Sequence, residues 1–210
     1  MAELMGDPRD PDAHDDARTA ADDLIALALE TAPADTSAAV GGDAAAAREA
    51  AAHCKKGHAH FKRHEWAEAL KAYRAAVKVD PKMSEAWFWI SAAECEMNGG
   101  EPCEEEYVPL TRCIKLDPNN AMAHLNFGSV LLDVRKDPTK AEESFREAIR
   151  LDPALALAHN NLGLLLHIAL KKPTEAKESY LEAIRLEPKF ARAHGNYSLL
   201  LEDQGDLGGD

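Results

Sequence analysis

One short stretch of the chain, HCKKGHAHFKRH at residues 53–64, holds side chains that could bind a metal ion. Cys54 and His58 are four residues apart, and so are His60 and His64, which in a helix places the members of each pair on one side. The two pairs fall on different sides of that helix, whereas a metal site needs its ligands to converge. We therefore expect no metal and no cofactor here.

A second set of polar side chains recurs at a constant spacing. The stretches AMAHLNFG, ALAHNNLG and ARAHGNYS place Asn126, Asn161 and Asn196 at intervals of 35 residues. An asparagine costs a helix roughly a few tenths of a kcal/mol relative to alanine, so the repetition needs a reason. A carboxamide donates and accepts, so the three could hold the backbone of an extended peptide, or each could hydrogen-bond to a neighbouring helix.

Patterns that would indicate an enzyme are missing from the sequence. It contains no G-x-S-x-G, no phosphate-binding loop and no pair of carboxylates with a cleft to hold them. We expect a protein without catalytic activity of its own.

The elements that position the amides are repeated pairs of helices. The segments AEALKAYRAAVKVDP, AEESFREAIRLDP and AKESYLEAIRLEP align at their C-terminal ends, and EEEYVPLTRCIKLDP is a degenerate fourth copy. Each follows a first apolar pattern with helical spacing and a short turn. Proline disfavours helix at the preceding residue, so the acidic residue before each proline should end the second helix. Thr139 and Glu142 fit a capping box at the start of one of these helices.

Charge is unevenly distributed along the chain. Its net charge is −13, of which residues 1–49 contribute −9 from 12 acidic and 3 basic side chains. Such a segment repels phosphate, so we expect no nucleic-acid partner. No apolar run approaches the roughly 20 residues that cross a bilayer, so we expect no membrane insertion. With no targeting signal and no paired-cysteine motif, we expect a cytoplasmic or nuclear protein with reduced thiols.

These features resemble the tetratricopeptide repeat (TPR) family. Repeat one matches its pattern at Gly57 and Tyr73, repeat three at Gly128 and Phe145, and repeat four at Gly163, Tyr180 and Pro188. Repeat two departs most, with Ser91 for glycine, Leu110 for the aromatic residue and Pro109 inside its second helix, which should be kinked or shortened. We expect residues 1–49 to be an acidic, mostly disordered segment with a short helix near 21–32. The four repeats should span 50–83, 84–120, 121–155 and 156–190. A terminal helix or partial fifth repeat should follow at 191–206, and a tail at 207–210.

The resemblance implies an all-α, right-handed α-solenoid of antiparallel helix pairs whose first helices line a concave groove. It places the histidines of the A-x-A-H-x-N frame where the family often has tryptophan, and it indicates packing for them. The three amides resemble the asparagine ladder of O-linked N-acetylglucosamine transferases and kinesin light chains. The residues expected to line a peptide-binding groove are therefore His58, Phe88, Trp89, Leu125, Asn126, Asn160, Asn161, Leu164 and Asn196.

The function that we expect is binding of an extended peptide or protein segment in this groove. One alternative is the substrate-recruiting part of a larger enzyme such as a glycosyltransferase. A chaperone cofactor fits less well, because the positions that hold a chaperone's terminal carboxylate in that group carry Cys54, His58, Trp89, Met122 and Asn126 here. We expect a monomer, or weak self-association through the C-terminal helix, whose SLLL run at 198–201 is more apolar than a good cap.

Overall fold

A computed structural model describes residues 42–206, so the predicted helix near 21–32 lies outside the described residues. Within that range the chain forms nine α-helices and no strand, which confirms the all-α class. The helices are α2 (Gly42–Phe61), α3 (Trp66–Val79), α4 (Ser84–Met97), α5 (Tyr107–Leu116), α6 (Ala121–Asp133), α7 (Pro138–Leu151), α8 (Ala156–Leu164), α9 (Pro173–Leu186) and α10 (Ala191–Asp206). A 3₁₀ turn (Glu104–Glu106) precedes α5, and a π-helical turn (Leu165–Ala169) extends α8.

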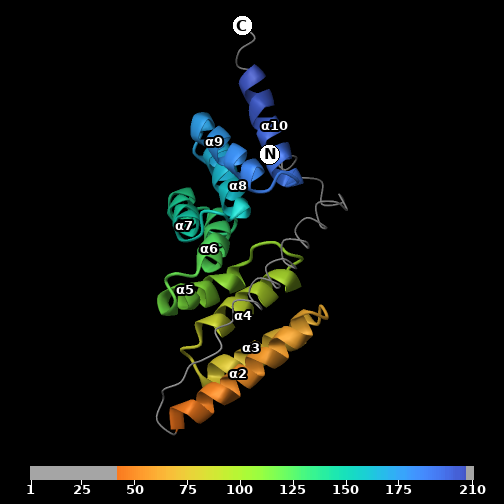
Figure 1. Cartoon of the computed structure of the whole chain (residues 1–210), viewed down its shortest axis with the longest axis vertical. Coiled ribbons are helices and arrows are strands. Elements are labelled where there is room, and N and C mark those ends of the chain that lie inside the picture. The colour runs from red at the N-terminus through yellow and green to blue at the C-terminus, as the bar shows by residue number, and fades with distance from the viewer. Residues whose placement is uncertain (1–41, 207–210) are drawn as a thin grey trace. The chain divides into compact units, whose positions relative to one another are not determined.

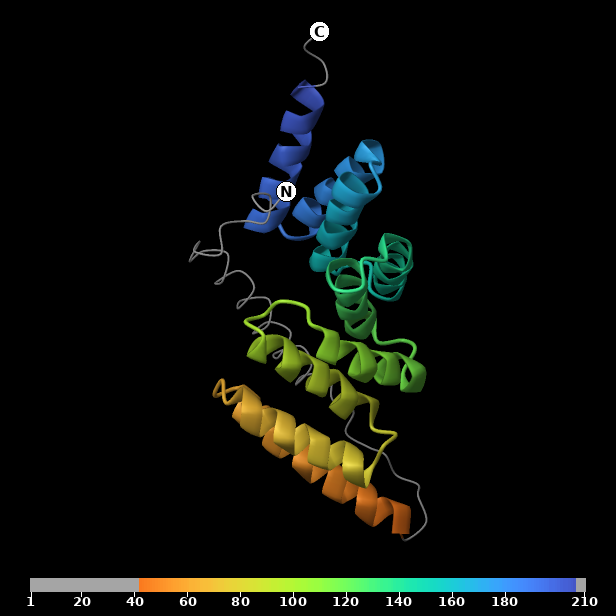
Figure 2. The same cartoon turned by 180° about the vertical axis from the view of Figure 1, so that it is seen from behind.

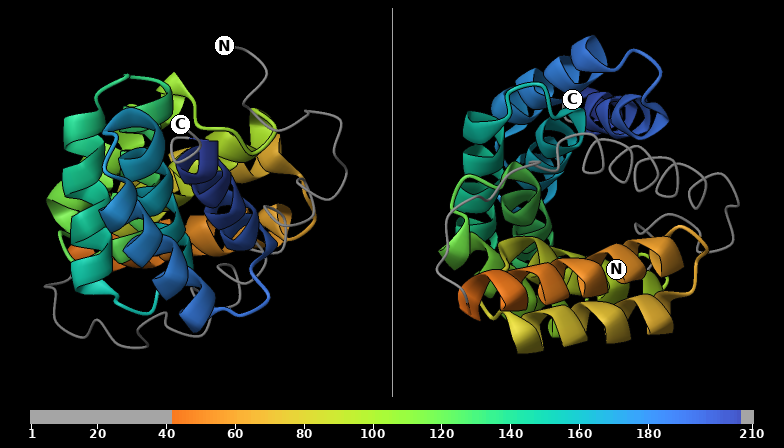
Figure 3. Two further views of the ribbon diagram at one scale, coloured as in Figure 1. Left: turned by 90° about the horizontal axis from the view of Figure 1, so that it is seen from above. Right: turned by 60° about the horizontal axis from the view of Figure 1, so that its bottom comes forward.

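The helices pack in pairs, and the pairs stack in sequence order. Helices α2 and α3, α4 and α5, α6 and α7, and α8 and α9 are partners, and each second helix also contacts the first helix of the next pair. Within residues 42–206 the stack runs from α2 at one end to α10 at the other (Figures 1 and 2). The array curves, with α2 on the inner side and α3 on the outer side (Figure 3). This is the predicted α-solenoid.

The acidic residue before each junction proline ends a second helix, as predicted. Helix α7 ends at Leu151, and the N–H of Asp152 donates to the carbonyl of Ala148 at 2.8 Å. The ends of α3, α5 and α9 show the same arrangement at Asp80, Asp117 and Glu187. The prolines therefore set the repeat boundaries, because helix is disfavoured at the residue that precedes them.

A close contact between a glycine and an aromatic ring holds the two helices of a repeat together. A Cβ on Gly163 would lie 2.7 Å from Cδ1 of Tyr180, which no real side chain tolerates. The corresponding distances for the Gly57–Tyr73 and Gly128–Phe145 pairs are 2.4 and 2.6 Å. Each ring is fully buried, and it takes the space that the missing Cβ leaves.

Repeat two loses both members of this contact together. Ser91 and Leu110 stand in their places and are both fully buried. Leu110 is smaller than tyrosine, so the opposite position no longer has to be glycine. Helix α5 has 10 residues where α3, α7 and α9 have 14, which confirms the predicted shortening, and Pro109 lies in its first turn, where proline is tolerated.

One predicted helix start is wrong, and another helix starts earlier than its repeat. Helix α2 begins at Gly42, so it includes the last eight residues of the segment 1–49 that we expected to be mostly disordered. Helix α7 is capped by Asp137, whose carboxylate accepts the N–H of Lys140 at 3.2 Å, and Pro138 is its first residue. Thr139 is thus already inside the helix and cannot form the predicted capping box.

Two further features concern the environment of the chain. None of the helices in the described range is both long and apolar enough to span a membrane. All four cysteines are free, so the two disulfides that their number would allow are not formed.

Candidate peptide-binding face

The recurring amides lie on the first helices of successive repeats. Asn126 is on α6, Asn160 and Asn161 are on α8, and Asn196 is on α10. The repeat spacing thus places equivalent side chains on neighbouring helices, as the sequence predicts.

The amides of α8 and α10 form a chain of hydrogen bonds across the stack. Nδ2 of Asn196 donates to Oδ1 of Asn160 at 3.0 Å, and Nδ2 of Asn160 donates to Oδ1 of Asn161 at 3.1 Å. Nδ2 of Asn161 then reaches Oγ of Ser129 on α6 at 3.5 Å. We call this chain of hydrogen bonds the amide relay. It joins three repeats, so these amides hydrogen-bond to neighbouring helices, which is the second of the two roles considered for them. Asn160 is fully buried and does not belong to an exposed groove.

A further amide and two exposed leucines lie on the same helices as the relay. Asn126 is half-buried, and its side-chain amide makes no hydrogen bond to any described residue. Leu164 and Leu199 follow Asn161 and Asn196 by three residues, so each lies on the same side of its helix as the amide. Their side chains are 36% and 50% exposed. We call Asn126, Asn161, Leu164, Asn196 and Leu199 the amide face.

The π-helical turn adds a residue that sequence reasoning missed. Ile168 is 50% exposed and lies one turn beyond Leu164, at the end of the first helix of repeat four. A π-turn inserts one residue into the helical register, so it moves side chains to a face that α-helical spacing does not predict. The sequence offers no signal for this shift.

The prediction that Trp89 is an exposed anchor of the groove is wrong. Its indole is 4% exposed and packs against the rings of His58, Phe61, Tyr73 and Phe88, with centroids 4.9, 5.1, 6.0 and 5.6 Å away. Trp89 occupies the ladder position of repeat two, where later repeats have Asn126 and Asn161. The position faces the preceding repeat, so a large aromatic side chain there is buried between α2 and α4.

Two further predicted groove residues are less available than expected. Leu125 is 1% exposed and belongs to the core of repeats three and four, so its assignment to the groove is wrong. Phe88 is half-buried and packs against a second core cluster that includes Leu110 and Val130. The apolar part of the candidate face therefore lies toward the C-terminal half of the described range.

The histidines of the repeated frame join one repeat to the next. His124, His159 and His194 each place Nε2 3.0–3.1 Å from the carbonyl oxygen of the proline six residues earlier. Trp87 makes the equivalent bond from Nε1 to the carbonyl of Pro81 at 2.9 Å. Since a carbonyl only accepts, the histidine Nε2 must carry the proton. These rings hold the turn between repeats, so their role is structural, as predicted.

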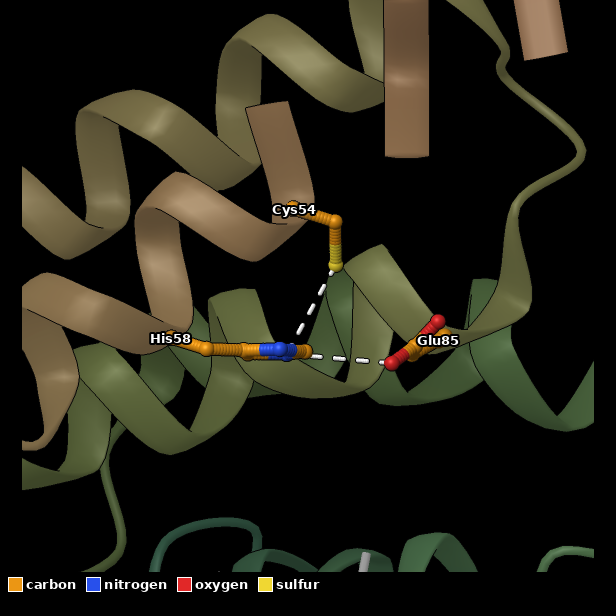
Figure 4. A group of neighbouring side chains, drawn as sticks. All are labelled: Cys54, His58 and Glu85. Atoms are coloured by element: carbon orange, nitrogen blue, oxygen red, sulfur yellow. Dashed lines mark hydrogen bonds and ion pairs between the residues drawn. The ribbon is translucent and has the colours of Figure 1, made fainter. Parts of the chain in front are cut away.

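His58 contributes to a cluster of a thiol, an imidazole and a carboxylate in repeats one and two. Cys54 and His58 lie on α2, and Glu85 comes from the start of α4 (Figure 4). Nε2 of His58 is 3.6 Å from Sγ of Cys54 and 3.7 Å from Oε1 of Glu85. Burial, with a smaller contribution from Lys62, lowers the pKa of His58 to about 4, so the ring is neutral at physiological pH. His60 takes no part, because it pairs with Glu65.

Comparison with known families agrees with this architecture. Models of the tetratricopeptide repeat match residues 50–83, 110–156 and 156–190, which together make up more than half of the chain. The chain belongs to the tetratricopeptide repeat family. A search of curated proteins gave no match.

Several solved structures share the fold. MamA 41-end from Desulfovibrio magneticus RS-1 aligns with a TM-score of 0.66 and 20% identity over 80% of this chain and 89% of that one. Pseudomonas aeruginosa pilF aligns with a TM-score of 0.64 and 22% identity, covering 77% and 72%. A Thermobaculum terrenum O-GlcNAc transferase mutant aligns with a TM-score of 0.58 and 24% identity over 70% of this chain but 27% of that one. Identities this low show a common fold and no more.

Proposed function

We propose that this TPR protein is a protein-interaction scaffold that holds an extended segment of a partner protein against the amide face. The observation that carries this proposal is the combination of a free carboxamide at Asn126 with exposed leucines at Leu164 and Leu199. Amides can bind a peptide backbone, and exposed apolar side chains beside them can bury alternate side chains of the same segment.

The amide relay refines the expected mode of binding. Asn160, Asn161 and Asn196 use their Nδ2 groups within the stack, so they are not three independent contacts for a ligand. They fix the positions of α6, α8 and α10 relative to one another. A rigid face loses less conformational freedom on binding, which favours affinity.

A quantitative comparison of partners tests this proposal. The full chain and a Leu164→Asp/Leu199→Asp variant would be used to select from a displayed random peptide library, and the selected peptides would be measured by fluorescence anisotropy. The matched control is Leu181→Asp, which alters a leucine that is 43% exposed on the second helix α9. We expect the double variant to lose binding and the control to retain it. Equal binding by all three proteins would show that the peptides bind outside the amide face, and the proposal would be wrong.

A non-catalytic role is part of the proposal. The cluster of Cys54, His58 and Glu85 contains the residue types of a nucleophilic triad, but the thiol and the carboxylate both approach Nε2 of the imidazole. A triad uses the two ring nitrogens separately, one for the nucleophile and one for the carboxylate. Burial and the charge of Glu85 also raise the pKa of Cys54 to about 12, which disfavours a nucleophilic thiolate. The substrate-recruiting alternative would use the same amide face for binding.

Weak self-association through the terminal helix is also part of the proposal. Leu200 on α10 is buried in the core, but the flanking Leu199 and Leu201 are 50% and 44% exposed. In a solenoid the next repeat would cover such a face. Sedimentation velocity over a range of concentrations should show reversible dimers that Leu201→Asp abolishes. A monomer at every concentration would show that the chain does not self-associate, and the exposed leucines would then be available only to a partner protein.

A further inference from the structure

We propose that Cys54, His58 and Glu85 form a binding site for a Zn²⁺ ion that joins the first two repeats. The sequence alone did not indicate this site, because its two candidate pairs, Cys54/His58 and His60/His64, lie on different sides of the same helix. The third ligand, Glu85, comes from the next repeat and is brought to the pair only by the stacking of α4 on the first helix pair.

Two of the three donor separations are close to those that a tetrahedral ion requires. The three donor atoms all lie within 4.8 Å of one another (Figure 4). Zn–S and Zn–N bonds of about 2.3 and 2.05 Å at a tetrahedral angle separate sulfur from nitrogen by roughly 3.6 Å. Sγ of Cys54 and Nε2 of His58 are 3.6 Å apart, and Nε2 is 3.7 Å from Oε1 of Glu85. The side chain of Glu85, which lies partly in solvent, would have to rotate to bring its carboxylate to the same distance from the sulfur.

The donor set selects the kind of metal. A thiolate, an imidazole and a carboxylate together match Zn²⁺, whereas Mg²⁺ and Ca²⁺ require oxygen ligands alone. Three protein ligands leave the fourth position of a tetrahedral ion to water or another ligand. Solvent can reach it, since the side chain of Glu85 is 48% exposed and that of His58 is 16% exposed.

The surroundings of the imidazole hold it in position for this role. The rings of Tyr73 and Trp89 pack against His58, with centroids 5.5 and 4.9 Å away. When Nδ1 carries the proton, the lone pair of Nε2 can bind a metal ion. A ligand that is already oriented loses little freedom when the metal binds.

Binding includes one proton transfer to solvent. The thiol of Cys54 has to lose its proton to bind a metal ion. Zn²⁺ displaces that proton: the S–H bond breaks, a Zn–S bond forms, and one proton is released for each ion bound. Affinity should accordingly rise as the pH is raised.

The experiment uses the full-length, untagged chain under reducing conditions. Zinc retained after dialysis would be measured by elemental analysis, and Co²⁺ would be added as a spectroscopic probe. We expect one Zn²⁺ per chain, a thiolate-to-cobalt charge-transfer band, proton release on binding and a higher melting temperature with Zn²⁺. Glu85→Gln should weaken binding at least about tenfold, since even the outer partners of metal ligands are worth that much. Cys54→Ser should remove the charge-transfer band.

Matched controls separate this site from the other histidines and cysteines. Glu49→Gln alters an exposed carboxylate that lies 4.0 Å from His53 on the same helix, and Cys103→Ser removes another free thiol. Both controls should bind like the parent chain. If Cys54→Ser does not fold, Glu85→Gln still decides, because its side chain lies largely at the surface. The proposal is wrong if the parent chain gives no cobalt–thiolate band, or if Glu85→Gln binds zinc as tightly as the parent chain does.

Discussion

Gly163 and Tyr180 lie so close together that a Cβ on the glycine would be 2.7 Å from the tyrosine ring. We expect Gly163→Ala to destabilise the protein by about 1–3 kcal/mol, the usual cost of overpacking. Gly195→Ala is the matched control, because nothing lies within 4 Å of its added Cβ, and it should stabilise α10 by roughly 0.5–1 kcal/mol. Urea unfolding measures both. Equal effects of the two substitutions would contradict the contact.

The same ring leads to a second prediction. The hydroxyl of Tyr180 is buried and has no hydrogen-bond partner among the described residues, and the equivalent residue in repeat three is Phe145. Removing an unsatisfied polar group avoids its desolvation cost, so Tyr180→Phe should stabilise the protein by about 1 kcal/mol. Thermal unfolding tests this. A lower melting temperature would mean that the hydroxyl has a role that its burial does not reveal.

A third prediction concerns the bonds that join successive repeats. His159→Ala should cost about 1 kcal/mol by removing the hydrogen bond to the carbonyl of Pro153. His159→Trp should retain most of the stability, because Trp87 makes the equivalent bond in repeat two. Denaturant unfolding of the two variants distinguishes hydrogen bonding from general packing. If tryptophan is as destabilising as alanine, the bond is not the important interaction.

Features that depend on residues close together in the sequence could be predicted, whereas features that depend on contacts between repeats could not. Helix pairs, junction prolines and the short α5 follow from local spacing and from the backbone limits of proline, so they could be predicted. The burial of Trp89 and the approach of Glu85 to Cys54 depend on how one repeat packs on the next. Periodicity shows that Trp89 faces the preceding repeat but does not show how much space it finds there.

A fourth prediction concerns pH. Burial raises the pKa of Glu106 to about 7, and the nearby charge of Glu94 adds to this, while hydrogen bonds from Cys103 and Cys95 oppose it. The folded-state value lies above the unfolded one, so this group stabilises the fold fully below pH 4.5, and the contribution is lost as the pH rises through about 7. Over that interval the free energy of unfolding should fall by up to about 1.4 kcal/mol per pH unit relative to Glu106→Gln.

Glu106→Gln is the control for this pH effect. Glutamine keeps an oxygen that can accept the N–H of Cys103, which Oε1 of Glu106 accepts at 3.0 Å, but it cannot ionise. Urea unfolding at several pH values would give the difference between the two proteins. Parallel curves from pH 4.5 to 8 would show that Glu106 ionises normally in the folded chain.

The last prediction separates the amides that build the stack from the amide that can bind a partner. Asn160 is fully buried, accepts from Asn196 and donates to Asn161, so Asn160→Ala should cost about 1–3 kcal/mol by removing both hydrogen bonds. A double-mutant cycle with Asn196→Ala should give a coupling of roughly 0.5–3 kcal/mol, because the two side chains share a bond. Asn126→Ala should leave stability unchanged or slightly higher, since alanine is the better helix former. It should instead weaken a selected peptide by about 1 kcal/mol, which is nearly tenfold in Kd. If Asn126→Ala unfolds the chain, or if Asn160→Ala changes peptide affinity without changing stability, the division between a structural relay and a free binding amide is wrong.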